Sequence, residues 1–126
     1  MMYRNILAIA AINGLLATIL GAYGAHGLKA ELSDTLWSAY RTANQYHFYH
    51  TLALLALAAF ASVRPWPKLA WVAWGWQIGI VLFSGSIYAL ALGAPSWMGP
   101  VTPLGGLTLM CAWGLLFQQA LAKKDV

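Results

Sequence analysis

Charged side chains are scarce in this chain. Only 8% of its 126 residues are Asp, Glu, Lys or Arg, and 61% are hydrophobic, whereas about a quarter of the residues in an ordinary soluble domain are charged. A surface that faces water cannot be built from so few charges, but a surface that faces lipid hydrocarbon needs none. The composition therefore excludes an ordinary soluble domain and predicts an integral membrane protein.

Cysteine and catalytic motifs are scarce as well. Cys111 is the single cysteine and lies in an apolar stretch, which excludes an internal disulfide and a zinc site made of cysteine thiolates. No phosphate-binding loop occurs, and no nucleophile stands beside a base in the way that hydrolases require. The net charge of +4 comes from scattered Lys and Arg. Because they form no basic stripe, no nucleic-acid partner is expected.

Four long apolar segments dominate what is present. A bilayer core about 30 Å thick requires roughly 20 apolar residues in a helix, and open strands in lipid would leave backbone groups unpaired. We therefore predict an all-α membrane protein with one transmembrane domain, residues 1–126. Short connections favour an antiparallel four-helix transmembrane bundle. The predicted spans cover residues 5–25, 45–63, 69–92 and 101–122.

The connection after the first span has a helical signal of its own. Ser33 can cap a helix that begins at Asp34. An apolar face follows, which predicts a short interfacial helix on the membrane surface, before the second span. The residues on that face are Leu36, Trp37, Tyr40 and Ala43.

Basic residues predict the orientation, because Lys and Arg are enriched in cytoplasmic loops. Five of them flank the spans on the side of the termini, and two flank the other side. We therefore expect both termini in the cytoplasm. The five are Arg4, Arg64, Lys68, Lys123 and Lys124, and the two are Lys29 and Arg41.

Small residues predict where the helices meet, since membrane helices associate through close contact and hydrogen bonds. Asn13 and Gln77 are expected to pair between the first and third spans, and Ser84 and Ser86 to bond back to carbonyls of their own helix. The glycines expected at helix contacts are Gly14, Gly21, Gly24, Gly75, Gly79, Gly105 and Gly106.

The unusual polar residues converge at the end of the bundle opposite the termini. One interpretation is structural, with histidines bonded to neighbouring groups and no cofactor. The other is a binding site for a metal, haem, quinone or lipid, because three imidazoles suit zinc or copper and a histidine pair can ligate haem iron. The candidate binding residues are His26, His47, His50, Ser84, Ser86 and Tyr88, and the candidate metal ligands are His26, His47 and His50.

Four ordered motifs carry a family resemblance. They are GAYGAHGL at 21–28, YHFYH at 46–50, FSGSIY at 83–88 and TPLGG at 102–106. With these motifs the chain resembles the YgdD/YwdK-like family of small bacterial inner-membrane proteins, also called domain of unknown function 423. The resemblance implies a four-helix membrane fold in the inner membrane. It implies no activity and no catalytic residues.

Three functional hypotheses follow. The favoured one is a non-enzymatic structural or accessory membrane component, with the lipid bilayer and other membrane proteins or a second copy as partners. The alternative is the cofactor, metal, quinone or lipid site built around the three histidines. An oligomeric transporter ranks last, because no span has a charged residue at its centre.

Overall fold

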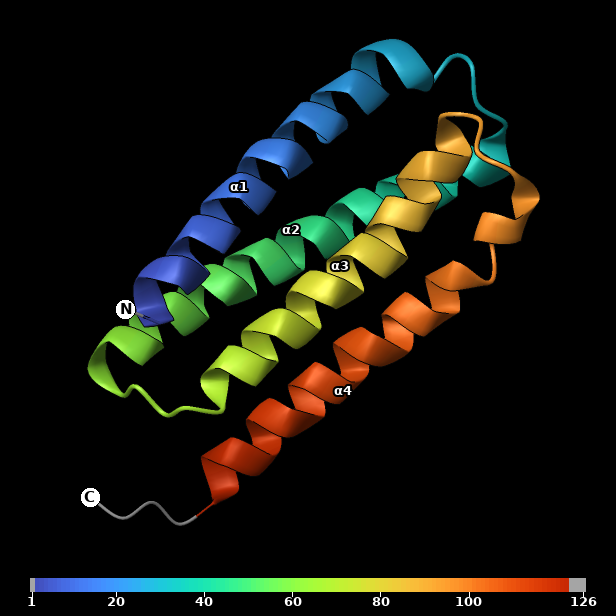
Figure 1. Ribbon diagram of the computed structural model, residues 1–126. Coiled ribbons are helices and arrows are strands. Elements are labelled where there is room, and N and C mark those ends of the chain that lie inside the picture. Colours follow the sequence, from blue (N-terminus) through green and yellow to red (C-terminus); the bar gives the residue numbers. More distant parts are fainter. Residues whose placement is uncertain (1, 123–126) are drawn as a thin grey trace.

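The computed structural model describes residues 2–122, and within that range it consists of helices without strands (Figure 1). Each of the four long helices is long and apolar enough to cross a membrane. The predicted all-α membrane fold is confirmed. The long helices are α1 (Met2–Tyr23), α2 (Asp34–Val63), α3 (Leu69–Ala91) and α4 (Val101–Leu121), and the short ones are η1 (Gly24–Leu28) and η2 (Ser96–Met98).

Consecutive helices run antiparallel and pack against each other. In Figure 1, α1 and α4 lie on opposite sides, with α2 and α3 between them. The start of α1 and the end of α4 lie beside the turn that joins α2 to α3, residues 64–68. We call this the turn end. The opposite end, which holds the connections 29–33 and 92–100, is the loop end.

The predicted interfacial helix is wrong, because α2 is one unbroken helix from Asp34 to Val63. Ser33 caps it as expected, and its hydroxyl accepts a hydrogen bond from the Leu36 backbone N–H at 3.2 Å. Tyr40 and Ala43 are buried inside the bundle instead of lying on a membrane surface. A helix of 30 residues is about 45 Å long. The α2 helix is therefore longer than the hydrocarbon core is thick. The predicted interfacial helix and the predicted second span are one continuous helix.

Glycines allow the closest helix contacts. A Cβ atom on Gly105 of α4 would overlap the backbone of Phe83 on α3. A Cβ on Gly79 of α3 would lie 2.5 Å from Cδ2 of Leu109 on α4. Close contact of backbones is how membrane helices gain dispersion energy in the absence of a hydrophobic driving force, so α3 and α4 form a tight pair.

The other predicted glycines divide into two groups. A Cβ on Gly75 would lie 2.7 Å from Cβ of Ala112, and one on Gly21 would lie 2.9 Å from Oδ1 of Asn44. Gly24 is equally constrained by the Tyr40 ring. Gly14 and Gly106 differ, because a Cβ there would make ordinary contacts at 3.5 and 3.7 Å. These two positions do not require glycine for space.

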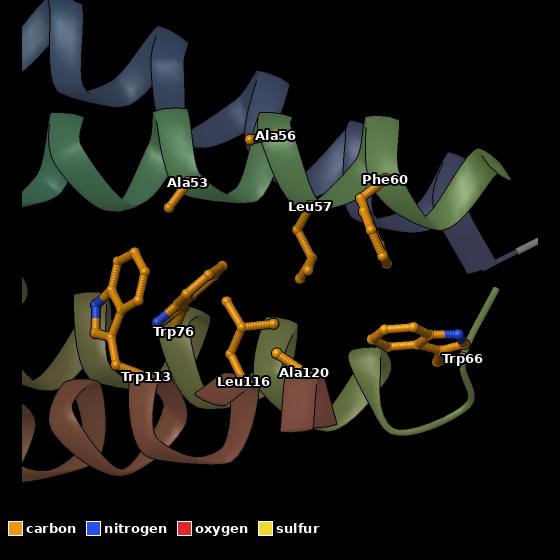
Figure 2. Close-up of a pocket in the computed structure, with 9 residues that line it drawn as sticks. All are labelled: Ala53, Ala56, Leu57, Phe60, Trp66, Trp76, Trp113, Leu116 and Ala120. Carbon is orange, nitrogen blue, oxygen red and sulfur yellow. The ribbon is translucent and has the colours of Figure 1, made fainter. Parts of the chain in front are cut away.

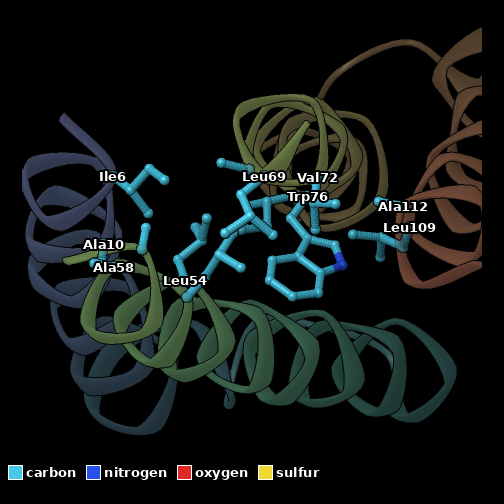
Figure 3. Close-up of a cluster of buried hydrophobic side chains, with 13 residues drawn as sticks. Ile6, Ala10, Leu54, Ala58, Leu69, Val72, Trp76, Leu109 and Ala112 are labelled. Carbon is cyan, nitrogen blue, oxygen red and sulfur yellow. The ribbon is translucent and has the colours of Figure 1, made fainter. Parts of the chain in front are cut away.

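Two apolar clusters surround a polar layer. Figure 3 shows the larger cluster, in which Trp76 of α3 fills the space between the helices and is 1% exposed. The smaller cluster lies toward the loop end and includes Leu28, Tyr40 and Ile87. Both clusters take side chains from several helices, so the apolar packing holds the polar residues between them in a fixed environment.

We predict that Gly105→Ala destabilises the fold by about 1–3 kcal/mol or more, since the added methyl meets backbone atoms that cannot rotate away. The matched control is Gly114→Ala on the same helix, where a Cβ meets nothing within 4 Å. Unfolding in detergent micelles by a denaturing detergent measures both variants. Equal stabilities of the two variants would contradict the close contact of α3 and α4.

Candidate functional site

A row of hydrogen-bonded side chains in the interior connects α1, α2 and α3. Asn13 donates from Nδ2 to Oε1 of Gln77 at 2.5 Å, which confirms the predicted pair. His47 lies 3.0 Å from Oδ1 of Asn13 through Nε2 and 3.0 Å from the Tyr88 hydroxyl through Nδ1. Asn44 donates to the same hydroxyl at 3.2 Å. We call these five side chains the polar chain.

Hydrogen-bond counting fixes the tautomer of His47. Both amide hydrogens of Asn13 are used, one on Gln77 and one on the backbone oxygen of Ile9 at 2.8 Å. The Asn13 carbonyl oxygen is then an acceptor, so Nε2 of His47 carries the hydrogen that it receives. The other ring nitrogen, Nδ1, is consequently an acceptor.

The direction of the remaining bonds follows. Nδ1 of His47 accepts the hydrogen of the Tyr88 hydroxyl. The oxygen of that hydroxyl accepts from Asn44, whose second amide hydrogen goes to the backbone oxygen of Ala17 at 3.0 Å. Every bond in the polar chain therefore points the same way, from Asn44 toward Gln77, with a neutral imidazole in the middle.

The middle of the polar chain is buried, its two end amides on Asn44 and Gln77 are half-buried, and each of its buried side-chain polar atoms has a hydrogen-bond partner within residues 2–122. Asn13 and His47 are each 3% exposed. An unpaired polar group in hydrocarbon costs several kcal/mol, so each partner stabilises the fold mainly by removing that cost. Both ends of the chain are amides, and an amide neither takes up nor releases a proton near neutral pH. The arrangement is suited to locking three helices together and unsuited to passing protons along the row.

His50 belongs to a different contact. Its Nδ1 donates to the backbone oxygen of Tyr46 at 2.8 Å, and its Nε2 accepts from Nε1 of Trp113 on α4 at 3.0 Å. It is therefore the opposite tautomer to His47. The indole partner was missed in the sequence, because Trp113 is separated from His50 by 63 residues and no local pattern links the two.

The structure does not gather the three histidines that the sequence placed together. His26 is exposed in η1 at the loop end, whereas His47 and His50 are buried in α2. Three residues along a helix turn the side chain by about 300°, which leaves the two rings about 60° apart. The His47 ring contacts Asn13 of α1 and Tyr88 of α3, whereas the His50 ring lies against Trp76 of α3 and Trp113 of α4. Across residues 2–122, no three His, Cys, Asp or Glu side chains are placed to hold a metal ion.

The two candidate serines bond in different ways. Ser86 donates within its own helix to the backbone oxygen of Phe83 at 2.9 Å, as expected, and also lies 2.5 Å from the Thr102 hydroxyl of α4. Ser84 instead donates to the backbone oxygen of Ala43 on α2 at 2.7 Å, so the expectation of a bond within its own helix is wrong there. The close approach of α2 and α3 explains the difference. Both serines connect helices.

A groove lies between α2 and α4, and no local sequence pattern indicates it. Its volume is about 510 Å³, and Figure 2 shows aromatic and aliphatic side chains around it. Trp76 of α3 forms one wall, and its ring centre lies 4.6 Å from that of Trp113. The indole N–H of Trp76 is buried without a hydrogen-bond partner in the described part of the chain.

Comparison with known proteins identifies the family of this chain. The sequence model of the family described as "Protein of unknown function (DUF423)" matches residues 20–106. The chain belongs to this family. The resemblance found in the four motifs is confirmed, since the matched residues include all four motifs in full. The description of this family assigns no activity.

Three relatives match most of the chain. The membrane protein YwdK of Bacillus subtilis is 41% identical over 108 residues, which are 85% of this chain and 88% of that protein. A membrane protein of Staphylococcus epidermidis, SERP0230, is 37% identical over 110 residues, 87% of this chain and 89% of that one. The inner membrane protein YgdD of Escherichia coli is 36% identical over 121 residues, 96% and 92% of the two chains. No solved structure matches. This chain is therefore a small polytopic membrane protein.

We predict that Tyr88→Phe destabilises the protein by about 1–2 kcal/mol. One interhelical hydrogen bond in a membrane averages only about 0.6 kcal/mol, but this hydroxyl makes two, and its loss leaves Nδ1 of His47 without a donor. Tyr49→Phe is the control, because Tyr49 is exposed and its hydroxyl makes no hydrogen bond within residues 2–122. Denaturation in detergent measures the difference. A loss in Tyr49→Phe as large as that in Tyr88→Phe would contradict the role of the polar chain.

Proposed function

We propose that the protein is a non-enzymatic structural or accessory component of the inner (cytoplasmic) membrane. The observation that carries this proposal is the internal satisfaction of the polar chain, in which each buried group is bonded to another part of the same protein. Catalysis needs an acid, a base or a nucleophile that can reach a substrate. The buried candidates have protein partners. They are His47, His50, Ser84, Ser86 and Tyr88.

The outward faces support an accessory role. The α4 helix packs against α3 with one side and exposes large apolar side chains on its other side. The α1 helix has a similar exposed face. Such faces are neutral toward lipid, but they can also hold the helix of another membrane protein through close contact. The exposed residues of α4 include Leu104, Leu107, Met110, Phe117 and Leu121, and those of α1 include Leu7, Ile12, Leu15, Leu16 and Ile19.

Photo-cross-linking in cells tests the accessory role. A photoreactive amino acid at Leu107 of α4 or at Ile12 of α1 should give a discrete protein adduct from at least one face. The same amino acid at Glu31, which is exposed in the connection at the loop end, controls for random collision. Native mass spectrometry after detergent-free extraction should then give a complex of fixed mass. Lipid adducts alone, together with recovery as an isolated monomer, would overturn the proposal.

We further propose that both termini and the turn end face the cytoplasm. Support comes from the sequence count of five basic residues against two. Three of the five, Arg4, Arg64 and Lys68, lie at the turn end, and Lys123 and Lys124 lie outside the described residues. At the loop end the acids Glu31 and Asp34 offset the two basic residues. The charge asymmetry thus agrees with the way the helices are arranged in space.

Cysteine labelling tests this orientation in a Cys111→Ala background. Ser96→Cys lies in η2 at the loop end, and Val63→Cys lies at the last residue of α2, which is 75% exposed. A maleimide that cannot cross the inner membrane should label Ser96→Cys in intact cells and Val63→Cys only after lysis. The reverse pattern would place the termini outside the cytoplasm.

A further inference from the structure

The residues that line the α2–α4 groove include no member of the polar chain and none of the glycines at the helix contacts. The groove exists because α2 and α4 both pack on α3 but are separated from each other at the turn end. Small residues keep it open, with Ala53 and Ala56 on the α2 side and Ala120 on the α4 side. A volume of about 510 Å³ is within the range of roughly 300–1,000 Å³ typical of small-molecule sites.

The walls of the groove are apolar. Leu57 and Phe60 of α2 face Leu116 of α4, and indole and alkyl carbons cover most of the remaining surface. Ala56, Phe60 and Ala120 are exposed at its rim, so the groove opens sideways toward the lipid hydrocarbon. An occupant that enters from there must be a flexible apolar chain or another apolar surface.

One end of the groove differs in charge. Trp66 borders it at the turn end, as Figure 2 shows, and its ring centre lies 5.1 Å from that of Phe60. Arg64 and Lys68 stand two residues before and after Trp66, and both are exposed. No side chain within residues 2–122 forms an ion pair with either of them, and the described acids Glu31 and Asp34 lie at the opposite end of the bundle.

We propose that the α2–α4 groove binds one anionic phospholipid. An acyl chain occupies the groove between Leu57 and Leu116, and the phosphate lies at Arg64 and Lys68. Trp66 is at the boundary between chain and headgroup, the level at which tryptophan is enriched in membrane proteins. The commitment to an anionic lipid rests on charge complementarity: an uncharged occupant or a second copy of the chain would fill the apolar part and leave the two cations unmatched.

This inference goes beyond the structural role proposed above and is independent of the orientation. The site requires only that the turn end reach a headgroup layer, on whichever side of the membrane that layer lies. A protein without partner proteins could still bind the lipid, and a protein that does not bind the lipid could still be an accessory component. The two experiments therefore distinguish the two proposals.

Native mass spectrometry of the purified full chain with added lipid tests the headgroup contact. The probes are phosphatidylglycerol and phosphatidylcholine with identical palmitoyl and oleoyl chains. We expect one saturable phosphatidylglycerol per chain, bound about tenfold more tightly than phosphatidylcholine, because each basic side chain near a membrane surface adds a several-fold attraction for anionic lipid. Arg64→Gln with Lys68→Gln should reduce this preference to near unity. Lys29→Gln with Arg41→Gln removes the same charge at the loop end and should leave the preference intact.

Filling the groove tests the acyl-chain contact. Ala56→Phe places a ring in the groove and should weaken binding of both lipids at least tenfold, whereas Ala59→Phe, exposed on the same helix outside the groove, should have little effect. Ala120→Leu provides a second filling variant from α4 if Ala56→Phe does not fold. Circular dichroism and gel filtration in detergent confirm folding of each variant.

Several results would overturn the proposal. Equal affinity for the two lipids, or an equal loss of preference when charge is removed at either end, would show that Arg64 and Lys68 form no specific headgroup site. Many weakly bound lipids without saturation would indicate an ordinary annular shell. A dimer that forms in place of the lipid complex and is lost in Ala56→Phe would assign the groove to a second copy of the chain.

Discussion

The cost of an unpaired polar group in hydrocarbon is the constraint on which this structure depends. Asn13, His47 and Tyr88 lie in the interior of a bundle only four helices wide, where water is not available to bond to them. Each therefore needs a protein partner, and the partners are on other helices. The positions of α1, α2 and α3 relative to one another are fixed by this requirement together with the apolar clusters on either side of it.

The same constraint explains why His47 and His50, three residues apart, have different hydrogen-bond partners and opposite tautomers. An imidazole has one donor and one acceptor when neutral, and each ring satisfies both within reach of its own helix face. His47 gives its hydrogen to Asn13, and His50 gives its hydrogen to a carbonyl one turn earlier. A metal ion would have to displace an indole from His50 or a tyrosine from His47. The geometry thus favours the structural interpretation of these residues over the ligand interpretation.

Much of the fold could be predicted because it is encoded locally. Apolar length gives the spans, Ser33 gives the start of α2, and the polar positions Asn13 and Gln77 gave a correct pair across two helices. The rest depends on relations that no local pattern carries. Whether Asp34 begins a separate helix depends on the packing of Tyr40 against α1, and the partner of His50 depends on where Trp113 lies on α4. The groove depends on the separation of α2 and α4, which follows from how both pack on α3.

The fourth helix is attached by a different principle from the other three. Between α1, α2 and α3 the contacts include the polar chain. The α4 helix instead contacts α3 closely at Gly105, where backbones meet, and at Gly79, where the Leu109 side chain packs, with hydrogen bonds at Ser86 and Trp113. Close contact of backbones needs small residues along one line only. The α4 helix therefore packs closely on α3, meets α2 through the Trp113–His50 hydrogen bond, and leaves the groove between α2 and α4 toward the turn end. The groove is the geometric consequence of that one-sided attachment. A bundle that instead closed α4 onto α2 would gain apolar contact but lose a lateral opening to lipid beside Arg64 and Lys68.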